Sequence, residues 1–217
     1  MNSHRSIAIS SSPAAILGFK GLSDWIATLA PYERKNAESF KKNEERISYV
    51  AAHILIRRAA ALLVNRSPQS LVLAQHCDVC GDYSHGRPSF VGLSNFYVSL
   101  SHTRGAVAAA ASDAPVGIDV ENLKSIQYSV MRSQKVFSLA EIAELDELNS
   151  QEQNEAALRL WVQKECLVKL GITSLDALST CDLNRLPAGM KISRWSHRGN
   201  TIVGAVAGNL ESELIIL

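Results

Sequence analysis

The sequence predicts an α+β protein built from two halves that share one order of elements. Helical spacing of apolar residues marks one strong helix in each half, over 43–64 and about 154–170. Short apolar runs separated by turn residues follow each helix and predict strands. We expect the halves to join near Ser112–Pro115, giving an N-terminal half over 1–113 and a C-terminal half over 114–217.

In the N-terminal half, the helix is predicted from Asn43 to Val64, because apolar residues recur there at three- and four-residue intervals. Ser67-Pro68 ends it, since proline removes a backbone donor and restricts the residue before it. The strands expected after this helix are the runs "SLVLA", "YVSLS" and "AVAAAAS".

The C-terminal half begins with the strand candidate "VGIDVE", residues 116–121. Ser138 followed by Glu141 has the spacing of a capping box and predicts the start of a second helix. The third helix is expected to stop at Gly171, which suits the left-handed conformation at a helix end. The remaining strand candidates are "MKISRW", "TIVGAVAG" and "SELIIL".

Composition narrows the classes of function. The chain of 217 residues has 47% hydrophobic and 20% charged residues, which is ordinary for a soluble globular protein. A net charge of +1 gives no overall attraction to nucleic acid or to membranes, so an anion site must be a local cluster. No apolar run reaches membrane-spanning length, and the N-terminus lacks the continuous apolar stretch of a signal peptide. We therefore expect a cytoplasmic protein that binds neither nucleic acid nor membrane.

Two acids interrupt the apolar run 116–121. Residues i and i+2 of a strand face one side, so Asp119 and Glu121 are expected to point together. Paired carboxylates repel each other in a water-poor setting, and a divalent cation with a preference for oxygen ligands, such as Mg²⁺, removes that repulsion. The alternative is an exposed strand end whose acids face water.

The third helix carries a second polar row. Trp161, Glu165 and Lys169 fall at i, i+4 and i+8 of this helix, beside a row that is apolar. A surface Glu–Lys pair would explain Glu165 and Lys169. It would not explain the tryptophan in the same row or the second lysine, Lys164.

Together these motifs resemble the 4′-phosphopantetheinyl transferases, of the larger single-chain type that activates surfactin synthetase. "VGIDVE" and "WVQKECLVK" are similar to the family's G-[IV]-D-x-E and W-x-x-K-E-x-x-x-K motifs. "SLSH", "GRP", "VFSLAE" and "AAHILIRR" resemble further family segments, and all occur in the family's order. Two departures are Ser99, where asparagine is common, and Arg87, where the family usually has lysine.

The resemblance implies an enzyme that moves the 4′-phosphopantetheine arm of coenzyme A to a serine of an apo-acyl or apo-peptidyl carrier protein. Mg²⁺ is the implied cofactor, and adenosine 3′,5′-bisphosphate is the implied by-product. The implied fold is a pseudo-dimer, in which each half packs a long helix on a small, mainly antiparallel sheet and the ligand cleft lies between the halves. A monomer is expected, because an internally duplicated fold forms its cleft without a second chain.

The resemblance also implies residue roles. Asp119, Glu121 and Glu165 would bind Mg²⁺, and Glu165 would also be the general base. Lys169 would neutralise or protonate the leaving phosphate, and Lys164 would contact a phosphate nearby.

Four more residues are implied contacts of coenzyme A. Arg57 would bind its 3′-phosphate, with Ser101 and His102 completing that site. Arg87 would reach the adenine or phosphate end. A solvated helix face is the alternative for the polar residues around Arg57.

Two other functions stay open. One is a zinc-binding interaction module built on Cys77, Cys80 and His85, although a loop with two reduced thiols explains this segment as well. The other is a Mg²⁺-dependent phosphohydrolase that uses the same acids on a nucleotide. The sequence does not indicate which carrier protein or pathway would be served.

Overall fold

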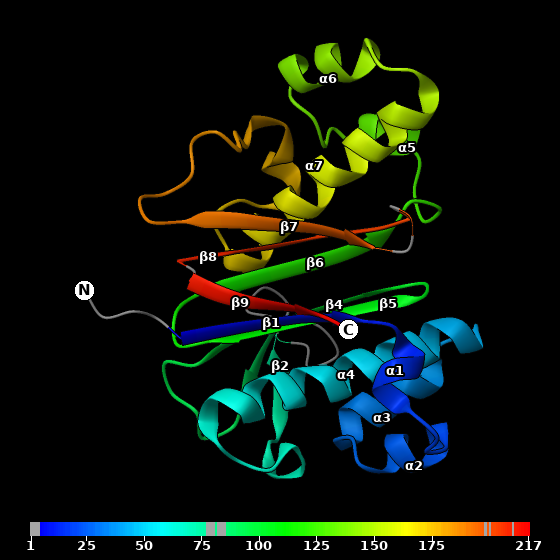
Figure 1. The fold of residues 1–217 in the computed structure, drawn as a ribbon, viewed down its shortest axis with the longest axis vertical. Coiled ribbons are helices and arrows are strands. Elements are labelled where there is room, and N and C mark those ends of the chain that lie inside the picture. The colour runs from blue at the N-terminus through cyan, green and yellow to red at the C-terminus, as the bar shows by residue number, and fades with distance from the viewer. Residues whose placement is uncertain (1–4, 77–80, 82–85, 198, 200, 210) are drawn as a thin grey trace.

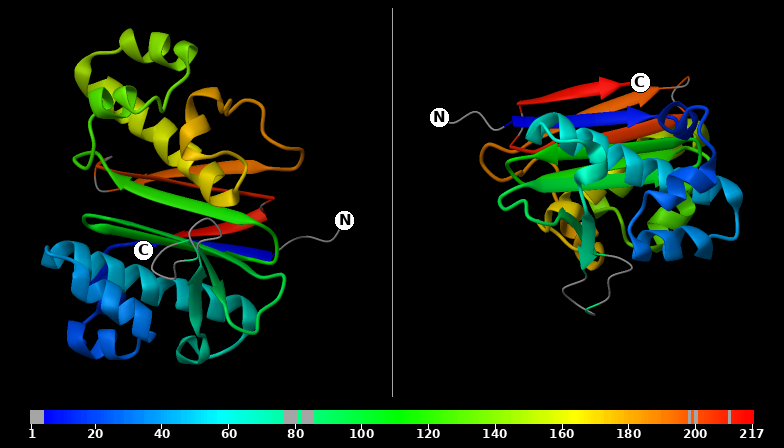
Figure 2. Two further views of the ribbon diagram at one scale, coloured as in Figure 1. Left: turned by 180° about the vertical axis from the view of Figure 1, so that it is seen from behind. Right: turned by 90° about the horizontal axis from the view of Figure 1, so that it is seen from below.

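The computed structural model describes residues 5–76, 81, 86–197, 199, 201–209 and 211–217, and it shows a mixed α+β protein. Two sheets pack against each other in the middle of the molecule, and one long helix covers the outer face of each sheet (Figure 1). The view from behind shows the same layers in the same order (Figure 2).

The elements before residue 115 form the lower part of Figure 1. In chain order they are β1 (Arg5–Ser11), α1 (Pro13–Leu17), α2 (Leu22–Ala27), α3 (Pro31–Ser39), α4 (Asn43–Val64), the 3₁₀ turn η1 (Pro68–Ser70), β2 (Leu73–His76), β3 (Arg87–Phe90), β4 (Tyr97–Thr103) and β5 (Ala106–Ser112).

The later elements form the upper part, apart from the last strand. They are β6 (Val116–Asn122), α5 (Tyr128–Ser133), α6 (Leu139–Asp146), α7 (Ser150–Leu170), the 3₁₀ turn η2 (Leu175–Thr180), β7 (Lys191–His197), β8 (Ile202–Gly208) and β9 (Glu211–Ile216).

Strand pairing defines the two main sheets and a small hairpin. The orders are β4-β5-β1-β9 and β6-β8-β7, with β2 and β3 paired separately. Every pairing is antiparallel except that of β1 with β9, where Ile9 lies opposite Ile215. The last strand therefore returns to the sheet of the first half, and the chain crosses the predicted boundary at 113/114 a second time. The division into two halves, and their relation as repeats, stay predictions.

Most predicted elements are present. The helix over Asn43–Val64 and the capping box of Ser138 with Glu141 are confirmed. The third helix begins four residues earlier than expected, at Ser150, because Asn149 accepts bonds from two backbone N–H groups and caps it. It ends at Gly171 with φ 74°, as predicted. The sequence did not predict β1, β3, α5 or the three short helices before residue 40.

Side-chain alternation in the strands builds three apolar layers. On β5, Val107, Ala109 and Ala111 face α4, while the alternate alanines face the other sheet. Within the described residues, α4 is the one helix long and apolar enough to cross a membrane. Its most apolar window is 72% buried inside the protein, so packing against β4 and β5 accounts for its composition.

Close contact between α7 and β6 depends on a glycine. A Cβ atom at Gly117 would lie 2.2 Å from the carbonyl oxygen of Cys166, so only glycine allows this approach. Gly117→Ala should force α7 away from β6 and lower the free energy of unfolding by about 1–3 kcal/mol, measured by urea denaturation. Gly21→Ala is the control, because its Cβ would first meet the flexible side chain of Asp24. Equal losses in both variants would contradict the argument.

Candidate active site

The predicted acidic pair lies on the face of β6 that α7 covers. Val116, Ile118 and Val120 point the other way, into the core between the two sheets. Asp119 and Glu121 alternate with them and share the side of Gly117, which touches α7. The strand period therefore places both carboxylates toward the helix that carries Glu165 and Lys169.

Asp119 is held through only one of its two oxygens. The residue is 4% exposed, and its Oδ1 accepts hydrogen bonds from the Ser101 hydroxyl at 2.7 Å and the Lys169 ammonium at 2.8 Å. Among the described residues, its buried Oδ2 has no hydrogen-bond partner. An ionised oxygen without a partner is costly to bury, so this atom is suited to a cation.

Two further carboxylates respond to the charge on Asp119. Burial, followed by the charge of Asp119, raises the pKa of Glu165 to about 7. The same two causes, in the same order, raise the pKa of Glu121 to about 7, against hydrogen bonds from Ser125 and Thr103. The structure thus brings Glu121 and Glu165 within electrostatic range of Asp119.

These acids fit an oxygen-ligated cation by their chemistry. Carboxylate oxygens are the ligands that Mg²⁺ prefers, and the free Oδ2 of Asp119 supplies one such atom. Across the part of the chain that is described, no three His, Cys, Asp or Glu side chains stand in an arrangement ready to hold a metal ion. The assignment of Asp119, Glu121 and Glu165 as ligands therefore stays a prediction.

Lys169 joins three elements at this point. Its Nζ donates to Asp119 Oδ1, to the Ile118 carbonyl at 2.8 Å and to the Leu100 carbonyl at 3.3 Å. Burial lowers its pKa, and the charge of Asp119 more than offsets this, so the pKa of Lys169 is raised overall. Lys169 is therefore a fully bonded cation that ties α7 to both β4 and β6.

Lys164 lies elsewhere, which argues against its expected phosphate contact. It is fully buried, and its ammonium donates to Glu141 Oε2 at 2.6 Å and to the carbonyls of Val136 and Leu178. All three hydrogens thus have acceptors in the protein. Lys164 instead fastens α7 to the start of α6 and to η2.

Arg57 also differs from its expected role. Its guanidinium makes a two-point ion pair with the fully buried Glu33 of α3, at 2.9 and 2.6 Å. It also donates to the carbonyls of Leu71 and His53. These partners leave Arg57 as a structural residue in the first half, not as a free phosphate ligand.

The two remaining residues expected to contact coenzyme A, His102 and Arg87, lie in different surroundings. The His102 ring packs edge-on against Phe40 and Tyr49, and burial is the main cause that lowers its pKa to about 4. It is therefore neutral at pH 7. Arg87 and Lys169 line one pocket of about 310 Å³, to which both halves of the chain contribute. Whether coenzyme A binds there stays a prediction.

The comparisons with known proteins match this part of the chain. Residues 115–203 match the model of the 4′-phosphopantetheinyl transferase superfamily, and this segment contains Asp119, Glu121, Glu165 and Lys169. Over these residues the chain is similar to that superfamily. The subclass that activates surfactin synthetase is not distinguished by this match.

Several 4′-phosphopantetheinyl transferases are similar to this chain at low sequence identity. The 4′-phosphopantetheinyl transferase psf-1 of Bacillus pumilus is 34% identical over 86 residues, which is 40% of this chain and 36% of that protein. AcpT of Salmonella typhimurium is 28% identical over 150 residues, covering 69% and 70% of the two chains. Sfp of Bacillus subtilis is 21% identical over 145 residues, covering 67% and 61%. This chain matches between 36% and 60% of the length of three such relatives.

Three hydroxyls of β4 face β6, and one of them, Ser101, contacts a candidate site residue, Asp119. Ser99, Ser101 and Thr103 alternate with apolar or aromatic residues, so they share the face toward β6. That alternation was the signal available in the sequence. The family motif, by contrast, groups Ser101 with His102, whose ring lies on the other side of the sheet.

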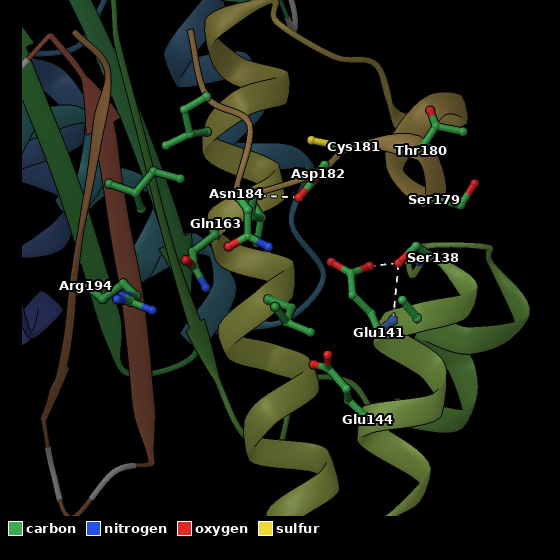
Figure 3. Close-up of a pocket in the computed structure, with 15 residues that line it drawn as sticks. Ser138, Glu141, Glu144, Gln163, Ser179, Thr180, Cys181, Asp182, Asn184 and Arg194 are labelled. Atoms are coloured by element: carbon green, nitrogen blue, oxygen red, sulfur yellow. Dashed lines mark hydrogen bonds between the residues drawn. The ribbon is translucent and has the colours of Figure 1, made fainter. Parts of the chain in front are cut away.

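A further cavity lies on another side of α7 from the acids. It holds about 680 Å³ between α6, α7, the end of η2 and β7. Figure 3 shows Glu141 bonded to Ser138 at its rim, with Gln163 of α7 facing inward. Since Glu165 and Lys169 are absent from its lining, this cavity is separate from the candidate active site.

The cysteine segment of the zinc alternative, Cys77 to Cys80 with His85, lies outside the described residues. The comparisons do not favour a zinc module or a phosphohydrolase, since the matching family is a transferase superfamily.

Proposed function

We propose that the chain transfers the 4′-phosphopantetheine arm of coenzyme A to a serine of an apo-acyl or apo-peptidyl carrier protein, with Mg²⁺ and as a monomer in the cytoplasm. The observation that carries the proposal is the buried, unshared Oδ2 of Asp119 beside Glu121, Glu165 and Lys169. The superfamily match over the same residues supports it.

In this proposal, Asp119, Glu121 and Glu165 hold the metal. A bound Mg²⁺ would stabilise the charge that develops on the leaving phosphate. The protein's part is to keep the three acids together. Burial is the main cause that raises the pKa of both glutamates, and the charge of Asp119 is the second. Positioning and electrostatics supply most of the catalysis of phosphoryl transfer.

Glu165 is the proposed general base. The serine oxygen of the carrier attacks the phosphorus that bears pantetheine, and the bridging P–O bond to adenosine 3′,5′-bisphosphate breaks. Glu165 accepts the serine proton, directly or through water, and its partly buried place on α7 suits that task. Lys169, already charged and fixed beside Asp119, compensates negative charge on the leaving group.

The pocket shared by Arg87 and Lys169 is the proposed place for a phosphate of coenzyme A. A Cβ at Gly171 would lie 2.7 Å from Arg87 Nη2, so the glycine that ends α7 leaves room for this guanidinium. Arginine suits phosphate because its planar fork donates two parallel hydrogen bonds.

The test is a mass measurement on the acceptor. The protein is mixed with coenzyme A, Mg²⁺ and a panel of apo-acyl and apo-peptidyl carrier proteins. The expected result is the mass of one phosphopantetheine added to at least one carrier. Release of phosphopantetheine without a carrier would instead identify a phosphohydrolase, and stoichiometric zinc in the purified protein would favour the interaction module.

A further inference from the structure

The strand β4 turns three hydroxyls toward the second half of the molecule. Ser99 Oγ accepts a bond from the Ile118 backbone N–H at 3.1 Å, and Ser101 Oγ donates to Asp119 Oδ1 at 2.7 Å. Thr103 lies close enough to Glu121 to lower the pKa of that carboxyl, against its burial. The three hydroxyls thus meet β6 at Ile118, Asp119 and Glu121, and the last two are candidate metal ligands.

Ser101 has one hydroxyl hydrogen, and it donates this hydrogen in its bond to Asp119. The Ser101 side chain is buried, so that bond is shielded from water. A phosphate accepting from the same hydroxyl would have to displace Asp119. The neighbouring His102 faces the opposite way, toward Phe40 and Tyr49 of the first half. The side chains of Ser101 and His102 therefore point to opposite sides of the sheet.

We propose that Ser101 is a positioning residue for Asp119 and not a phosphate ligand. Together with Lys169 it saturates Oδ1, which fixes the carboxylate and leaves Oδ2 as its only open atom. This inference rests on the proposed function, because it assigns Oδ2 to the metal.

The test separates metal affinity from coenzyme A affinity, and neither measurement needs turnover. Mn²⁺ binding is followed by electron paramagnetic resonance, and binding of coenzyme A without metal is followed by calorimetry. Ser101→Ala should weaken Mn²⁺ binding about 10-fold or more, as loss of an outer hydrogen bond to a metal ligand typically does. Coenzyme A affinity should stay within about twofold. Ser101→Thr, which keeps the hydroxyl, should restore Mn²⁺ binding.

Ser99→Ala is the matched control, since Ser99 lies on the same face and bonds a backbone N–H instead of a carboxylate. It should leave Mn²⁺ affinity unchanged. Should Ser101→Ala fail to fold, Ser101→Cys keeps the shape with a weaker donor and carries the same test. Normal Mn²⁺ binding with weaker coenzyme A binding would overturn the inference. Failure of the unmodified protein to bind Mn²⁺ would count against the proposed function itself.

An independent observation concerns Trp25 of α2, on the outer side of the first half. Lys20 Nζ lies 4.5 Å from the centre of its ring, and the Arg58 guanidinium lies 5.6 Å from it. The indole N–H donates to the Leu17 carbonyl at 2.9 Å, which fixes the ring. Two cations therefore gather at one immobile side chain.

These cations line a pocket of about 160 Å³ that contains no Asp or Glu. Among the described residues, neither Lys20 nor Arg58 has an ion pair with a carboxylate. Arg57 also lines the pocket, but Glu33 neutralises it. Gln69 is at the rim, and its Oε1 already accepts from Ser67, which leaves its amide nitrogen available as a donor.

The geometry points to a subsite for a small phosphate-class anion between Lys20 and Arg58. Arginine with lysine is a common phosphate-binding pair, and no acid lines this pocket to neutralise the two cations. The site is distinct from Asp119, which is on β6 of the other half.

Inorganic phosphate is the probe, and the indole N–H resonance of Trp25 is the readout in a ¹H–¹⁵N NMR titration. Saturable shifts are expected in the unmodified protein and in Asp119→Asn, with at least about fivefold weaker binding in Lys20→Gln and Arg58→Gln. Arg66→Gln, at the exposed end of the same helix region, is the control and should bind as before. Absence of saturation, or equal weakening in Arg66→Gln, would overturn the subsite.

Discussion

Replacing Asp119 by asparagine is expected to lower the rate of phosphopantetheine transfer by at least about 100-fold while the protein stays folded. Asparagine keeps the shape of the side chain and an oxygen that accepts from Ser101 and Lys169. It loses the charge of Oδ2, the buried oxygen without a partner in the described structure. The rate is measured by mass spectrometry of the carrier protein.

Asp113→Asn is the matched control for this variant. Asp113 pairs with Arg5 at the surface, 3.9 Å away, and lies outside the acidic group around Asp119. Its substitution should leave transfer unchanged. Mn²⁺ binding measured beside the rate shows whether the loss in Asp119→Asn is one of metal affinity. Full activity of Asp119→Asn would refute the metal assignment.

Local periodicity was sufficient to predict which residues share a face. The two-residue repeat of β6 put Asp119 and Glu121 together, and the helical row of α7 put Glu165 and Lys169 together. The bond between Lys169 and Asp119, 2.8 Å long, joins these two patterns in space. No periodicity in either segment could have predicted that contact, and the family resemblance supplied the link.

Long-range partners set the contacts that the sequence did not predict. Arg57 and Lys164 both lie in motif segments, and both turn inward to acids from other elements, Glu33 and Glu141. A sequence shows a cation and its spacing, but not which distant acid neutralises it. The same limit hid the pairing of β9 with β1, since the partner strands lie at opposite ends of the chain.

Neutralising Glu33 by Glu33→Gln should lower the free energy of unfolding by about 3–5 kcal/mol, because it leaves the buried Arg57 without its counter-charge. Glu33 is fully buried, and it accepts from Arg57, from His53 at 2.6 Å and from the Ala30 N–H at 2.7 Å. Urea denaturation at pH 7 measures the loss. Glu44→Gln is the control: its pair with Arg104 is exposed, so its substitution should cost less than about 1 kcal/mol.

The same network predicts loss of stability in acid. Burial opposes ionisation of Glu33, but hydrogen bonds from His53 and Arg57 outweigh it and lower the pKa of Glu33 to about 2. The stability that this carboxylate contributes is complete above its unfolded pKa of 4.5 and is lost as pH falls toward 2. Burial also lowers the pKa of His53, so acid begins to favour the unfolded chain below about pH 6.5. Unfolding free energies measured from pH 7 to 3 should therefore fall steadily in the unmodified protein and more shallowly below pH 4.5 in Glu33→Gln, whereas parallel curves would show that Glu33 does not carry the effect.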